Sequence, residues 1–221
     1  AVGTQALGGG VDTSTGMICT DNTAIGSAAG YSITTGGDNV LVGRGAGSSV
    51  NTADYEVYVG AYAGDANTTG IANVAVGYKA FSSATTNSSN ADGKPVYNVA
   101  VGYKALEDMN DTDETASYGR NTAIGNTSMI NLTTGTSNTA LGHASMGLGT
   151  TTGHYNIAIG QAALYDLTSG NYNIVFGKDA GGNITEGEKN IIIGSDAGDS
   201  LTDDNYIVAI GHEAFSNAQG S

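Results

Sequence analysis

The sequence predicts an all-β fold, a parallel β-helix or β-roll solenoid of about 12 rungs with a basal repeat of 17 residues. A five-residue motif recurs along nearly the whole chain. Glycine is abundant, with 35 of 221 residues, whereas proline occurs once. No long apolar stripe follows the 3.6-residue period of a helix, and both glycine and β-branched residues disfavour helices. Together these observations favour short stacked strands.

The recurring motif consists of Asn, a β-branched residue, a small residue, a large aliphatic residue and Gly, as in Asn121–Gly125 and Asn190–Gly194. The closing glycines, which we call anchor glycines, are Gly3, Gly26, Gly43, Gly60, Gly77, Gly102, Gly125, Gly142, Gly160, Gly177, Gly194 and Gly211. Successive anchors are 17 or 18 residues apart, except for three intervals of 23 or 25. This regularity predicts one structural unit per interval.

Each unit divides into four parts. The residues three and one before the anchor are β-branched or large and apolar, which predicts a short strand with both side chains on one face. The anchor predicts a corner, and an Ala or Ser three residues later begins a second extended segment. A turn such as Thr133–Gly135 or Thr168–Gly170 then leads to the next unit.

One such unit cannot bury its own apolar face, so the units must stack. At about 4.8 Å per strand, 12 rungs form a rod on the order of 55 Å long. Equivalent residues then form columns, and the repeated Asn is expected to form a structural ladder in which amides hydrogen-bond along the rod. The ladder residues are Asn22, Asn39, Asn73, Asn98, Asn121, Asn138, Asn156, Asn173 and Asn190.

The strands are apolar on both faces, which is typical of strands buried on both sides. One face can fill the coil, and the other requires a second surface, so we expect association with other copies of the chain. The middle strand residue, usually Ala, suits close approach near a symmetry axis. We therefore expect a homotrimer seam at Ala24, Leu41, Tyr58, Ala75, Ala100, Ala123, Ala140, Ala158, Val175, Ile192 and Ala209.

Composition excludes several classes of protein. The net charge of −14 disfavours nucleic acid and anionic membrane surfaces as partners. The single cysteine permits neither an intrachain disulfide framework nor a thiolate zinc cluster. No apolar run approaches the roughly 20 residues that span a membrane. We expect one solenoid domain over residues 1–221, taken from a longer fibre.

Units such as Asn121–Gly125, Asn138–Gly142 and Asn156–Leu164 resemble the repeat shafts of phage tail fibres and, in a shorter form, the heads of trimeric autotransporter adhesins. The resemblance covers nearly the whole chain. It implies a parallel homotrimer located in a virion or, alternatively, on a bacterial cell surface, with other virion or surface proteins at the rod ends. The 17-residue period is more similar to that of the fibres.

The sequence predicts no enzyme and no cofactor. His143, His154 and His212 are scattered, and Cys19 has no fixed histidine partner, so neither a metal site nor a nucleophile is expected. The segment Gly8–Asp12 resembles a calcium-binding repeat but occurs once. A second cluster, formed by Asp111, Asp113 and Glu114, has oxygen ligands suited to Ca²⁺, although a solvated acidic loop is the preferred interpretation.

The three long intervals are insertions at 8–21, 82–97 and 107–120, and we expect them to emerge from one corner of the roll, the last two on neighbouring rungs. Loops on a rigid scaffold commonly carry recognition. Tyr97, Tyr118 and Arg120 are the candidate contacts to a host glycan or protein receptor; tolerated surface insertion is the competing interpretation. Tyrosines also recur five residues before the anchor, where they would meet glycan or cover the seam: Tyr55, Tyr97, Tyr155, Tyr172 and Tyr206.

The functional hypothesis is a structural and adhesive tail-fibre segment, with the head of a bacterial trimeric adhesin as the alternative. An ice-binding solenoid ranks lower, because the threonine column formed by Thr34, Thr68, Thr133, Thr168, Thr185 and Thr202 lacks a parallel second column. A polysaccharide-cleaving spike also ranks lower. It needs paired carboxylates about 5–10 Å apart in a groove, whereas the acids here lie mostly in turns.

Overall fold

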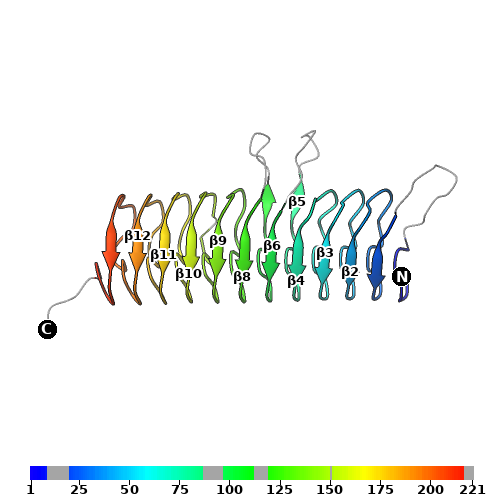
Figure 1. Ribbon diagram of the computed structural model, residues 1–221, viewed down its shortest axis with the longest axis horizontal. Helices are drawn as coiled ribbons and strands as arrows, with labels where there is room; N and C mark the ends of the chain where they lie inside the picture. The colour runs from blue at the N-terminus through cyan, green and yellow to red at the C-terminus, as the bar shows by residue number, and fades with distance from the viewer. Residues whose placement is uncertain (9–19, 87–96, 112–118, 150, 217–221) are drawn as a thin grey trace.

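The computed structural model describes residues 1–8, 20–86, 97–111, 119–149 and 151–216. These residues form a straight stack of coils, with one strand of each coil on the same side (Figure 1). The strands are β1 (Thr23–Ile25), β2 (Val40–Val42), β3 (Val57–Val59), β4 (Val74–Val76), β5 (Thr85–Thr86), β6 (Val99–Val101), β7 (Asn110–Asp111), β8 (Thr122–Ile124), β9 (Thr139–Leu141), β10 (Ile157–Ile159), β11 (Ile174–Phe176), β12 (Ile191–Ile193) and β13 (Val208–Ile210).

The main sheet has 11 parallel strands that follow one another in chain order, from β1 to β13 without β5 and β7. Each strand residue pairs with its equivalent one repeat later, for example Ala158 with Val175. The first predicted rung forms a bridge from Val2 to Ile25 rather than a strand, and the 11 strands of the main sheet are connected by about ten turns of the coil. The parallel solenoid with its 17-residue repeat is confirmed. Within the described ranges, no helix is long and apolar enough to cross a membrane.

The anchor position requires glycine for two reasons. The anchors adopt φ values between +126° and +145°, a backbone region that side chains with a Cβ rarely enter. A Cβ at Gly26 would lie 2.5 Å from the carbonyl oxygen of Gly43 in the next coil, and a Cβ at Gly43 would be blocked by Gly60 in the same way. The anchors therefore form a column of close backbone contacts, which sets the regular spacing of the coils.

The core lies inside the coil and is built from several columns. They are the middle strand residue and the residues three, four and seven after the anchor, on the returning segment. We compare the middle strand residue with the residue four after the anchor. Their sizes compensate. Large middle residues face glycine in the pairs Leu41–Gly47, Tyr58–Gly64, Val175–Gly181 and Ile192–Gly198, whereas alanine faces a large residue in Ala75–Phe81, Ala100–Leu106, Ala123–Met129, Ala140–Met146 and Ala158–Leu164. Each of these nine coils thus holds one large side chain between strand and return segment, whereas in the first coil Ala24 faces Gly30 and the side chains of Leu7, Ile33 and Leu41 approach that glycine.

Candidate interaction surfaces

The middle strand residues do not form a surface of the chain. The predicted seam column, from Ala24 to Ala209, is buried within the single chain, and most of its members have no exposed area. The assignment of these residues to a seam between chains is therefore wrong. The physical reason is that the middle residue points into the coil, where it packs against the return segment of the same chain, whether it is alanine or a larger residue such as Leu41 or Tyr58.

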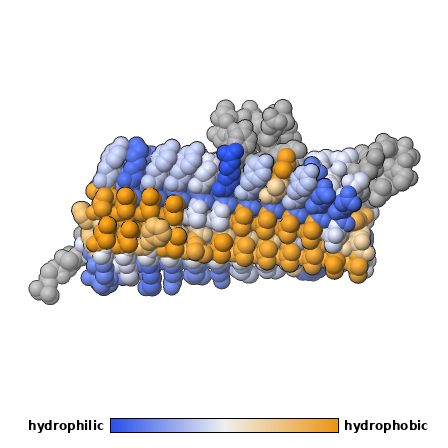
Figure 2. All heavy atoms as spheres, viewed as in Figure 1, coloured by the Kyte–Doolittle hydropathy of each residue, from blue (hydrophilic) through white to orange (hydrophobic). Residues whose placement is uncertain are grey.

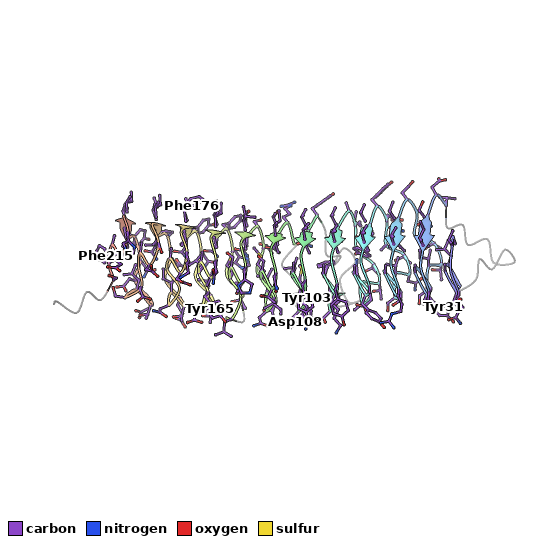
Figure 3. The ribbon with its side chains drawn as sticks, turned by 90° about the horizontal axis from the view of Figure 1, so that it is seen from below. Tyr31, Tyr103, Asp108, Tyr165, Phe176 and Phe215 are labelled. Atoms are coloured by element: carbon purple, nitrogen blue, oxygen red, sulfur yellow. The ribbon has the colours of Figure 1, made fainter. Side chains whose placement is uncertain are left out.

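The outward face of the sheet is instead formed by the first and third residues of each strand. Eight of these are among the exposed large apolar residues of the sheet: Ile25, Val40, Ile124, Leu141, Ile191, Ile193, Val208 and Ile210. We call this surface the outer sheet face, comprising the first and third residues of β1–β4, β6 and β8–β13. Figure 2 shows it as a nearly continuous apolar band along the rod. In Figure 3, Phe176 projects from the sheet side, whereas Tyr165 and Asp108 lie on the opposite side.

The buried Asn column lies at the residue before each strand, and it joins consecutive coils. The Oδ1 atom of Asn156 accepts the backbone N–H of Asn173 at 3.0 Å and its side-chain amide at 3.1 Å. The Nδ2 atom of Asn156 donates to the carbonyl of Gly170 at 2.9 Å, in the turn 14 residues later. Each such amide therefore binds the neighbouring coil and closes its own turn. Eight of the nine ladder asparagines are buried: Asn39, Asn73, Asn98, Asn121, Asn138, Asn156, Asn173 and Asn190.

Glu56 occupies the place in this column where the period requires an Asn. Its side chain has no exposed area, and burial raises the pKa of the carboxyl group from 4.5 to about 7, although hydrogen bonds from Tyr58, Asn73 and Asn67 oppose that rise. The pKa of Tyr58 is also raised well above its usual value, because that phenol is buried beside Glu56. The sequence analysis did not single out Glu56. The signal was its position, 17 residues after Asn39 and 17 before Asn73.

The second and third insertions begin side by side, as the spacing predicted. β5 and β7 form a separate two-stranded parallel sheet, in which Thr85 pairs with Asn110. Of the candidate receptor contacts, Tyr97 is 57% exposed, Arg120 is exposed, and Tyr118 lies outside the described residues. Their part in receptor binding stays a prediction.

The tyrosines form stacks along the rod. Tyr155 and Tyr172 lie parallel with ring centroids 5.0 Å apart, and Tyr78 and Tyr103 are stacked at 5.6 Å. In such stacks the face of each ring packs against the ring of the neighbouring coil, so mainly the ring edges are in contact with solvent. Beyond Tyr172, Lys189 lies over the ring of Tyr206 at 5.1 Å. The tyrosine columns thus bind neighbouring coils together.

Ion pairs join the two rungs that carry these insertions. The carboxylate of Glu107 is nearly buried. Its oxygens form ion pairs with the Nζ atom of Lys104 at 2.8 Å and with the Nζ atom of Lys79 at 3.8 Å. Lys104 lies in the same rung as Glu107, and Lys79 lies in the preceding rung. The partly exposed geometry makes this cluster a modest contribution to stability, of the order of 1 kcal/mol.

The predicted polar candidates take structural positions where the structure describes them. The Nδ1 atom of His154 accepts the backbone N–H of Thr136 at 3.0 Å. In the threonine column, Thr168 donates to the carbonyl of Thr185 at 3.0 Å. In the ranges that the structure describes, no three His, Cys, Asp or Glu residues are grouped to hold a metal ion. Cys19, Gly9–Asp12, Asp113 and Glu114 lie outside these ranges.

Comparison with family models, curated proteins and solved structures finds no match for this chain. The chain's class is therefore defined by its fold alone, as a parallel β-solenoid repeat protein.

Proposed function

We propose that the chain is a structural and adhesive rod without enzymatic activity, which forms a segment of a homotrimeric tail fibre and spaces or presents a host-binding surface. The observation that carries this proposal is the uncovered outer sheet face. Eleven strands at about 4.8 Å spacing, each about 10 Å long, give an apolar strip on the order of 500 Å². This area is at the upper end of what soluble monomers expose as one contiguous apolar patch, and such patches are often functional.

The strip suits association with copies of the same chain. It is straight and follows the rod axis, and its pattern repeats every coil, so a parallel copy meets equivalent residues along the whole length. A narrow strip of two columns fits a three-fold axis, where each chain faces two neighbours. Virion proteins at the rod ends and a host glycan or protein are the remaining proposed partners. The head of a bacterial surface adhesin is the alternative assignment and shares this assembly.

The proposal is tested by placing two charges on the outer sheet face, one on each of the neighbouring strands β8 and β9. Ile124→Asp and Leu141→Asp together put charges on the outer sheet face, where these side chains are 37% and 44% exposed. This variant should remain folded by circular dichroism but sediment as a monomer, because a carboxylate in a desolvated seam is strongly unfavourable. The matched control carries Asn126→Asp and His143→Asp, exposed on the same two rungs, and should assemble normally.

A second variant distinguishes the two faces. Ala123→Asp places a charge in the fully enclosed middle column, one residue before Ile124, and should unfold the local coils, since burying an unpaired charge costs several kcal/mol. If Ala123→Asp stayed folded and lost assembly, the seam would lie at the middle column after all. If the variant carrying Ile124→Asp and Leu141→Asp assembled with unchanged stability, the outer sheet face would be a solvent-exposed surface and the proposed rod assembly would fail.

A further inference from the structure

Glu56 breaks the uniformity of the Asn ladder at one rung. Every other ladder position from Asn22 to Asn190 carries a neutral amide. Glu56 stands in the same enclosed column between Asn39 and Asn73, with no exposed area. A buried carboxyl group can gain or lose a proton, whereas an amide is neutral at every ordinary pH. Within the ladder, this rung alone can therefore change its charge.

The groups around the carboxyl can all donate hydrogen bonds to it, and the Tyr58 hydroxyl can also accept one. From the following coil, Asn73 donates its backbone N–H to Oε2 at 3.0 Å and its amide to Oε1 at 3.1 Å. From the same coil, Asn67 lies 3.5 Å from Oε1, and the Tyr58 hydroxyl also bonds the carboxyl. The preceding coil provides Asn39, whose Oδ1 accepts the Glu56 backbone N–H at 2.8 Å.

No counter-ion accompanies these donors. The titratable group that faces Glu56 is Tyr58, a phenol that stays neutral at ordinary pH. Asn39, Asn67 and Asn73 carry no charge. Across the ranges that the structure describes, no Lys, Arg or His forms an ion pair with Glu56. A charge here is therefore stabilised only by dipoles, and it must be held in the interior of the rod.

We propose that Glu56 makes the junction between β3 and β4 a proton-controlled weak point of the rod. With its proton, Glu56 acts as the neutral ladder residue: its oxygens accept the N–H groups of Asn73 as an amide oxygen does elsewhere, and its O–H donates to the hydroxyl oxygen of Tyr58. Without its proton, the buried charge favours any opening that brings water to the carboxylate. This junction then separates before the all-Asn junctions on either side.

The pH range follows from the direction of the shift. Because burial raises the pKa from 4.5 to about 7, the folded rung binds its proton more tightly than the opened rung. The closed state is therefore most stable below pH 4.5, loses stability as the pH rises from 4.5 to 7, and is constant above 7. This dependence is opposite to that of an ordinary ion-paired surface carboxylate.

Hydrogen–deuterium exchange of the assembled protein tests the proposal. Protection factors, which remove the intrinsic pH dependence of exchange, are compared between pH 4.5 and pH 8 for the peptide that contains Glu56 and Asn73. Protection in the native sequence should fall by up to about 150-fold, which is half of the ratio that a shift from 4.5 to 7 permits, because the carboxyl group of the opened rung is half ionised at pH 4.5. In Glu56→Gln it should be independent of pH. The control Glu186→Gln, at an exposed turn position, should behave like the native sequence.

A direct titration keeps the test decisive if Glu56→Gln folds poorly. The side-chain carboxyl ¹³C resonance of Glu56 in the native protein should titrate near pH 7. A titration midpoint below 5 would overturn the proposal, because the carboxylate would then be fully stabilised by its donors. Equal protection at both pH values in the native sequence would overturn it as well.

Discussion

At the residue scale, the interior of each coil is governed by volume. A large side chain on the strand faces glycine on the return segment, and alanine on the strand faces a large side chain. A Cβ at Gly47 would lie 2.8 Å from the nearest Leu41 methyl group, and at Gly64 it would collide with the Tyr58 ring. The return position also has positive φ throughout, which Leu106 and Leu164 nevertheless adopt at 53° and 51°. Filling the coil therefore outweighs the backbone strain, which is about 1–2 kcal/mol per residue.

This compensation predicts that the two kinds of rung are interchangeable. Leu41→Ala alone should cost about 2–4 kcal/mol by leaving a cavity, and Gly47→Leu alone should cost about 1–3 kcal/mol by overpacking. The double variant reproduces the Ala100–Leu106 arrangement and should recover most of the stability, as measured by chemical denaturation. If the double variant lost as much stability as the two single variants combined, the side chains at positions 41 and 47 would not fill the same part of the coil.

At the scale of the element, the repeating unit combines a three-residue strand with a return segment. One face of the strand fills the coil, and the other forms the outer sheet face. The periodicity predicted the strands, the glycine corners, the parallel stacking and the side-by-side insertions, since these depend on spacing alone. The pattern could not tell which strand face points inward, because both are apolar. The decisive signal was the size compensation between the middle residue and the residue four after the anchor, which places Ala123 opposite Met129 inside the coil.

The insertions provide a prediction at the same scale. Residues 87–96 and 112–118 can be replaced by short Gly-Ser linkers that leave β5, β7 and the Glu107 ion pairs intact. The rod should fold and assemble as before, because β4, β6 and β8 are unchanged. If the insertions carry recognition, binding of the trimmed rod to host cells or to a glycan array should drop at least tenfold. Equal binding by the trimmed and parent rods would assign residues 87–96 and 112–118 a spacer role and would leave Tyr97 and Arg120, which the trimmed rod keeps, as the candidate contacts.

For the whole molecule, two properties oppose each other. The chain carries a net charge of −14, so parallel copies repel one another at long range. The apolar outer sheet face favours their contact. Surface charges are screened within about 10 Å at 0.1 M salt, whereas the apolar strip gains energy in proportion to the area it buries. At physiological ionic strength the burial of the outer sheet face should outweigh the charge repulsion, and the rods should associate.

The central claim is that this solenoid exists as a homotrimer, and sedimentation equilibrium at micromolar concentration tests it most directly. The chain has a mass of 22.0 kDa, so the account predicts a single species of three chains, about 66 kDa, with the circular dichroism of a β protein. A stable, folded species of 22.0 kDa at that concentration would contradict it, because the apolar outer sheet face would then be uncovered in solution.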